Sequence, residues 1–106
     1  MTWHDNYLVL DNQSVEFKNK IYKVLERETY IFVLLGFDFD PKSHCNIYCI
    51  QKDGHILWQI KKNKHNSTKS MSDAYIGLTY RNGCYEAINF YNQTVYFNPY
   101  NGKIIG

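Results

Sequence analysis

The chain has 106 residues, of which 44% are apolar, 21% are charged and 17% are aromatic. A chain of this length and composition is too apolar to be disordered, and it predicts one folded domain over residues 1–106 with a modest core. Twelve Lys and Arg against ten Asp and Glu give a net charge of +2, which is too small to indicate nucleic acid as the partner.

Alternating apolar and polar residues, separated by turn signals, predict β-strands in the first half of the chain. The first two strands cover 7–11 and 15–17, and 21–26 follows with an alternation that also suits a short helix. Residues 29–36 are apolar on both faces, which is typical of a central strand covered on both sides. Proline and a polar cluster then make 37–44 a loop.

Turn dipeptides organise the second half of the chain. Asp53-Gly54 and Asn82-Gly83 each lie between two strand-like runs, and such dipeptides supply the positive φ that a tight hairpin turn needs. The strands expected around these and later turns cover residues 45–51, 55–60, 74–80, 84–90, 94–98 and 103–105. The weakly hydrophobic stretch 61–72 predicts a mobile loop. We therefore expect an all-β domain of eight or nine short antiparallel strands, joined mainly by hairpins into a β-sandwich or a strongly curved sheet.

One phrase occurs twice, since residues 47–57 recur as residues 95–105 with matching Tyr, Asp-Gly or Asn-Gly turns, and two aliphatic residues after each turn. A match at a fixed offset is typical of repeated β-units. The second copy belongs to a longer pattern made of Asn82-Gly83-Cys84-Tyr85, Asn92-Gln93-Thr94-Val95-Tyr96-Phe97 and Asn101-Gly102-Lys103-Ile104. With this pattern, residues 76–104 resemble one blade of a PQQ-type β-propeller. A ring needs about four blades, so the resemblance implies two blade-like units packed against each other, and it gives no evidence for a quinone cofactor.

A second resemblance covers nearly the whole chain and rests on the order of its motifs. These are Leu10-Asp11-Asn12, Val15-Glu16-Phe17, Ile31-Phe32-Val33-Leu34-Leu35, Asn46-Ile47-Tyr48-Cys49, Lys52-Asp53-Gly54-His55-Ile56-Leu57-Trp58-Gln59-Ile60 and Gly102-Lys103-Ile104. In this order the chain is similar to small bacterial immunity proteins encoded beside contact-dependent growth-inhibition toxins. The resemblance implies a cytoplasmic, non-enzymatic protein that binds one cognate toxin domain as a 1:1 heterodimer and occludes its active site.

The N-terminus and the cysteines indicate the compartment. Residues 1–5 lack the basic start of a secretory signal, and no apolar run reaches the roughly 18 residues of a membrane span. Three cysteines are a poor disulfide framework. Cys45 and Cys49 would lie about 13 Å apart along one strand, beyond the reach of a disulfide or a shared metal ion. We expect a cytoplasmic protein with free, part-buried thiols and no membrane partner.

No local pattern supplies a catalytic or metal site. Asp38 and Asp40 resemble part of a calcium loop, but the Gly and the distal Glu of such a loop are missing. A nuclease-like set of His55, Lys62 and His65 has no partner group at a spacing that would make one of them a general base. We therefore expect no enzymatic activity, no cofactor and no bound metal.

Protein recognition is the function that the remaining features favour. Six Tyr fall within the 26 residues from Tyr75 to Tyr100, more than the core of so small a domain needs, and Tyr is a frequent interface anchor. If the toxin is a nuclease, its basic cleft calls for carboxylates on the inhibitor. The predicted toxin contacts are Asp38, Phe39 and Asp40 in the 37–44 loop, with Asp11, Glu16 and Asp53 as turn-borne alternatives and Tyr91 from the tyrosine cluster.

Two other hypotheses come from different classes. The basic segment 61–69 with nearby aromatics suits a small nucleic-acid-binding module, which would lose affinity steeply as salt rises. A fragment of a larger repeat protein would instead expose uncovered sheet edges and be poorly soluble. The immunity hypothesis expects a soluble protein that ignores nucleic acid.

Overall fold

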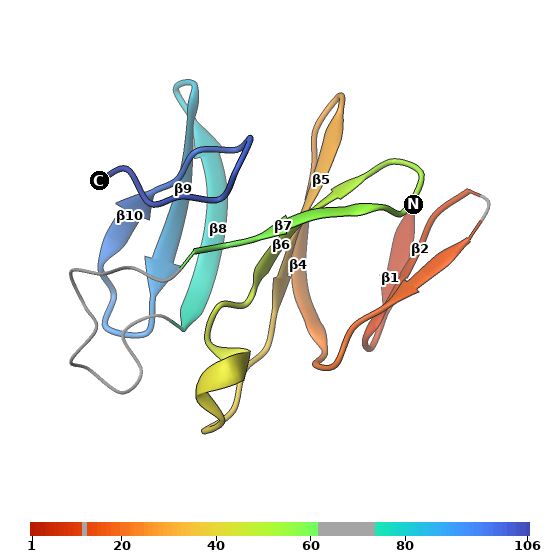
Figure 1. The fold of residues 1–106 in the computed structure, drawn as a ribbon, viewed down its shortest axis with the longest axis horizontal. Helices are drawn as coiled ribbons and strands as arrows, with labels where there is room; N and C mark the ends of the chain where they lie inside the picture. Colours follow the sequence, from red (N-terminus) through yellow and green to blue (C-terminus); the bar gives the residue numbers. More distant parts are fainter. Residues whose placement is uncertain (12, 62–73) are drawn as a thin grey trace.

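The computed structural model describes residues 1–11, 13–61 and 74–106, and within these ranges ten strands pair in three antiparallel sheets (Figure 1). The N-terminal sheet has the order β1-β2-β3, formed by Thr2–His4, Tyr7–Val9 and Ser14–Glu16. The central sheet has the order β4-β5-β6-β7, formed by Ile21–Glu26, Tyr30–Leu35, Ile47–Gln51 and Ile56–Gln59. The C-terminal sheet has the order β10-β9-β8, with β8 at Tyr75–Arg81, β9 at Cys84–Asn89 and β10 at Thr94–Tyr96. The predicted all-β, hairpin-joined fold is confirmed.

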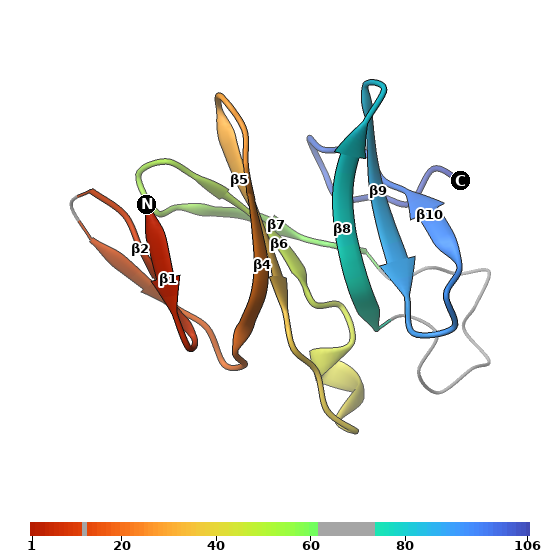
Figure 2. The ribbon, with the colours of Figure 1, turned by 180° about the vertical axis from the view of Figure 1, so that it is seen from behind.

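The central sheet lies between the other two, as Figures 1 and 2 show from opposite sides. Its strand β5 carries apolar side chains on both faces. Phe32 and Leu34 pack in a cluster shared with the C-terminal sheet, whereas Ile31, Val33 and Leu35 pack in a second cluster shared with the N-terminal sheet. All five side chains are buried. The run of apolar residues arises because both faces of this strand are dry, as the sequence predicted.

The two copies of the repeated phrase meet at the C-terminal cluster. The first copy is the β6–β7 hairpin, and it is followed by Trp58, whose Nε1–H donates a hydrogen bond to the Pro99 carbonyl at 2.9 Å. The second copy continues from β10 into a turn at Gly102, which lies directly against the Trp58 ring. A Cβ at Gly102 would stand 2.5 Å from Trp58 Cε3. The turn of the second copy is therefore docked on the tryptophan that follows the first.

The structure departs from the sequence predictions in its details. β1 was not expected from the sequence: it has only three residues, all exposed in the structure, and so short a run is not enough for a periodic pattern to identify a strand. With it, the N-terminal segment forms a third sheet beside the two that hold the repeated phrases. The expected strand 103–105 is reduced to one antiparallel bridge between Phe97 and Ile104. The ambiguous segment 21–26 is a strand.

Two connections between the strands were predicted as loops, 37–44 and 61–72. The 37–44 loop contains one 3₁₀ turn, η1, at Pro41–Ser43. Of the expected mobile loop 61–72, only Lys61 lies within the described residues. No helix in the described ranges has the length and apolar character needed to cross a bilayer.

Candidate interaction site

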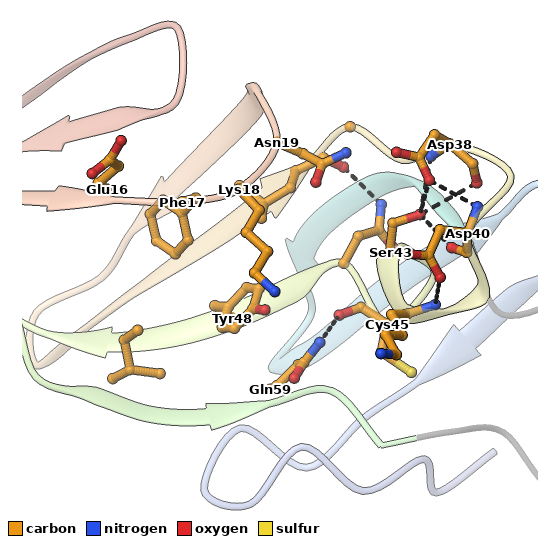
Figure 3. Close-up of a pocket in the computed structure, with 15 residues that line it drawn as sticks. Glu16, Phe17, Lys18, Asn19, Asp38, Asp40, Ser43, Cys45, Tyr48 and Gln59 are labelled. Atoms are coloured by element: carbon orange, nitrogen blue, oxygen red, sulfur yellow. Dashed lines mark hydrogen bonds between the residues drawn. The ribbon is translucent and has the colours of Figure 1, made fainter.

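A cleft of about 590 Å³ opens beside the loop that carries η1, where β3 and the β3–β4 connection face the β6–β7 hairpin (Figure 3). The charged side chains that line it are Glu16, Lys18, Asp38, Asp40 and Lys42. The Lys18 side chain extends into the cleft toward Tyr48. Three predicted contact residues, Glu16, Asp38 and Asp40, are thus brought to one cleft from distant parts of the sequence.

Internal hydrogen bonds hold the loop that forms one side of the cleft. Asp38 Oδ1 accepts from the Asp40 backbone N–H at 2.8 Å and lies 3.1 Å from the Ser43 hydroxyl. Asp40 Oδ1 accepts from the Lys42 N–H at 3.0 Å. Ser43 Oγ also accepts from the Asp38 N–H, and the buried His44 ring contacts the Asp38 carbonyl through Nε2 at 2.8 Å. Both carboxylates therefore help to fix the backbone that displays them.

The same contacts determine the charge of the loop. The hydrogen bond from the Asp40 backbone N–H, followed by that from the Ser43 hydroxyl, lowers the pKa of Asp38 below its usual range. These donors favour the ionised form, because a carboxylate accepts hydrogen bonds more strongly than a carboxylic acid does. Asp38 consequently carries its negative charge down to a lower pH than an ordinary aspartate.

Phe39 lies between the two carboxylates, and its side chain is 91% exposed. The neighbouring Phe37 anchors the loop instead: its ring packs edge-on against His44 at 6.1 Å and against Phe90 at 5.9 Å. Phe90 in turn contacts Tyr91 at 5.6 Å, and both of these rings are partly exposed. This row of rings connects Tyr91, the predicted contact from the tyrosine cluster, to the loop that carries Phe39.

Asp11 and Asp53 lie apart from this loop. Asp11 is exposed at the β2–β3 turn, and Asp53 is exposed at the β6–β7 turn, where its Oδ1 accepts from the His55 N–H at 3.0 Å. The two turns touch each other through Gly54 and the side chain of Gln13. In Figure 1 they lie at the end of the molecule opposite to η1. These two carboxylates thus form a separate acidic surface and cannot contact the same small feature of a partner as Asp38.

Some residues of the site were missed from the sequence. Lys18 and Lys42 add positive charge to a cleft that also holds three carboxylates, and no sequence pattern around these two lysines indicates a site. Ser43 closes the loop. A signal for this role existed, because Asp, Asn and Ser side chains bond the backbone a few residues away in turns, and Asp38, Asp40 and Ser43 have that spacing.

The other candidate chemistry does not assemble among the described residues. No group of three His, Cys, Asp or Glu there is placed to hold a metal ion. His55 is exposed, while Lys62 and His65 lie outside the described residues, as does nearly all of the basic segment 61–69. The thiols of Cys45, Cys49 and Cys84 form no disulfide. Cys49 is fully buried, and its burial raises the pKa of the thiol to about 12.

Comparison with known proteins places the chain in a family. Residues 1–106 match the profile described as Domain of unknown function (DUF7957). The chain belongs to this family. No curated protein and no solved structure matches the chain. Because the description assigns the family no activity, any functional inference depends on the fold and the site.

Proposed function

We propose that this protein is a cytoplasmic immunity protein that binds one cognate bacterial toxin domain and occludes its active site with the loop 38–40. The observation that carries the proposal is the display of Phe39, 91% exposed, on a backbone held by its own side chains. A large apolar side chain that contributes little to its own fold is suited to a pocket on a partner.

The rigidity of the loop favours tight binding. An interface loop that is ordered before binding loses less conformational entropy when the complex forms. Transfer of an exposed Phe side chain into a partner contributes about 1.5–3 kcal/mol, which corresponds to a factor of about 10 to 100 in affinity. Phe39 therefore has the character of an interface hot spot, supported by the partly exposed rings of Phe90 and Tyr91.

Asp38 and Asp40 supply the charge for a basic active site, such as that of a nuclease. Complementary charges at the rim of an interface mainly accelerate association and exclude wrong orientations. The low pKa of Asp38 keeps that side chain ionised, so this contribution persists at mildly acidic pH. Recognition would then combine one apolar anchor with two flanking carboxylates.

The decisive experiment starts from the gene immediately upstream, which the proposal expects to encode a large secreted protein with a C-terminal toxin domain, and it uses that domain. We expect a 1:1 complex by calorimetry, inhibition of the toxin, and at least about tenfold weaker binding for Phe39→Ala. Ile105→Ala is the matched control, because Ile105 is also a well-exposed apolar side chain but lies next to the C-terminus, which Figure 1 shows away from η1. Equal affinity of the Phe39→Ala and Ile105→Ala variants would contradict the loop assignment, and the absence of any complex would contradict the immunity role.

The charges require a different substitution, because Asp38 and Asp40 also hold the loop. Asp38→Asn with Asp40→Asn retains an oxygen that can accept the Asp40 and Lys42 N–H groups while it removes both charges. We expect this double variant to fold normally and to associate with the toxin more slowly, with a weaker dependence on salt. An unchanged association rate at low salt would show that the carboxylates do not steer the encounter.

A further inference from the structure

A second, smaller pocket of about 330 Å³ lies at the end of the molecule opposite to η1. Its lining residues come from the β4–β5 turn, from the start of β5, from β9 and from the turn after β10; among them are Arg27, Glu28, Tyr30, Tyr85 and Tyr100. It is thus built at the junction of the central and C-terminal sheets. It shares no lining residue with the larger cleft.

Arg27 is a cation in this pocket, and no carboxylate of the described residues forms an ion pair with it. Its guanidinium stacks on the Tyr80 ring, with Cζ 4.0 Å from the ring centroid. Its Nε is buried and has no hydrogen-bond partner, and no ion pair of the described residues includes it. The chain has one other arginine, Arg81, and that guanidinium is neutralised by the buried carboxylate of Glu86 at 3.0 Å. A part-buried guanidinium with unused donors favours the binding of an anion.

The walls of the pocket are aromatic and well supported. Tyr85 packs against Phe32 in the core with 4.8 Å between ring centroids, and Tyr30 contacts Tyr100 edge-on at 6.3 Å. The turn that carries Tyr100 is fixed by the hydrogen bond from Trp58 to the Pro99 carbonyl. Tyr100 itself is 76% exposed and forms the outer wall. Flat aromatic surfaces therefore line the same pocket as the Arg27 cation, and the core holds them in place.

We infer that this pocket binds a carboxylate attached to an aromatic or similarly flat apolar group. A planar carboxylate matches the paired donors of a guanidinium, and the attached group would pack between the tyrosine rings. A phosphate fits less well, because one guanidinium balances one negative charge and the Glu28 carboxylate also lines the pocket. This inference does not depend on the immunity role, since the toxin-binding loop lies at the other end of the fold.

The test titrates the whole protein with four small probes. Binding of each probe is measured from the changes in the chemical shifts of the backbone amides. Benzoate should bind in saturable fashion and shift the amides of Arg27, Tyr30, Tyr85 and Tyr100. Benzamide, which has the same shape without the charge, and acetate, which has the charge without the ring, should each bind at least tenfold more weakly, and so should inorganic phosphate. Equal binding of benzoate and benzamide, or tighter binding of phosphate, would overturn the inference. These comparisons use the unaltered protein and so do not depend on any variant folding.

Substitutions of Arg27 then test whether its guanidinium binds the carboxylate. Arg27→Gln should weaken benzoate binding at least tenfold, whereas Arg81→Gln, the matched control at the already neutralised arginine, should leave it unchanged in a folded sample. Arg27→Lys should give an intermediate affinity, because a lysine retains the charge but not the paired planar donors. Unchanged binding in Arg27→Gln would overturn the inference. N-acetylphenylalanine, compared with its amide, distinguishes the sources: tighter binding than benzoate indicates a chain terminus, and weaker binding indicates a free small carboxylate.

Discussion

Replacement of Gly102 by alanine tests how firmly the two repeated phrases are interlocked. The backbone φ at Gly102 is +75°, a left-handed conformation that costs an alanine about 1–2 kcal/mol. The new Cβ would also stand 2.5 Å from Cε3 and 3.0 Å from Cδ2 of Trp58. That ring cannot easily move, because it is buried, hydrogen-bonded to Pro99 and packed against Phe97 with 5.8 Å between ring centroids. Such overpacking costs a further 1–3 kcal/mol or so.

The chain provides a matched control that measures the cost of the left-handed backbone conformation without the contact with Trp58. Gly83 has a φ of +80°, and a Cβ there would meet nothing within 4 Å. Gly83→Ala should therefore lower the free energy of unfolding by about 1–2 kcal/mol, and Gly102→Ala by about 2–5 kcal/mol. In thermal unfolding the two losses correspond to about 4–10 °C and about 10–20 °C. Urea titrations followed by circular dichroism measure both. Equal destabilisation of the two variants, within about 0.5 kcal/mol, would refute the docking of Gly102 on Trp58.

Three further predictions concern stability, reactivity and pH. Asn46→Ala should cost about 3–5 kcal/mol of unfolding free energy in a urea titration, because the buried amide of Asn46 bonds both the N–H and the carbonyl of Tyr75, at 2.9 and 2.8 Å, and alanine removes both of these buried hydrogen bonds. With a pKa of about 12, only a fraction of about 10⁻⁴ of the Cys49 thiol is ionised at pH 8. Ellman's reagent should therefore modify the exposed Cys84 quickly and Cys49 only as the protein unfolds. Rapid modification of Cys49 in the folded protein would contradict its burial. Because the folded-state pKa of Asp38 is lowered, its ionisation stabilises the fold above the ordinary carboxyl range and this contribution is lost as pH falls through the lowered pKa. Asp38→Asn should therefore show a shallower loss of stability in acid, measured as the urea midpoint at a series of pH values, and an identical acid limb would contradict the lowered pKa.

The features predictable from the sequence are those determined by neighbouring residues. The apolar character of both faces of 29–36 identified the central strand, and the Asn82-Gly83 dipeptide identified a hairpin turn in which both residues have positive φ. The stacking of three sheets was not predictable in this way. It depends on contacts such as the bonds between Asn46 and Tyr75, which lie 29 positions apart and have no local signature.

In the candidate site, too, the sequence predicted correctly which neighbouring residues lie together but not how distant segments are placed. Asp38, Phe39 and Asp40 were selected as a local group and do share one loop, because adjacent residues on a polar turn remain together whatever the fold. Asp11 and Asp53 were predicted as alternatives because each is a carboxylate on a turn. Local patterns do not say which end of a strand faces which end of another, and the fold places these two turns at the opposite end of the molecule. The pocket at Arg27 was invisible for the same reason, since its walls come from two different sheets.

The position of β5 has a consequence for how the protein opens. Since the two apolar clusters have only the central sheet in common, either outer sheet can detach while the cluster on the other side stays intact. The N-terminal sheet, made of three strands of three residues each, has the fewest hydrogen bonds to lose. Amide hydrogen exchange should therefore be graded, fastest in β1 to β3 and slowest in β5. Proteases that probe transient opening should accordingly cut near the N-terminus first, leaving a core that still carries both copies of the repeated phrase.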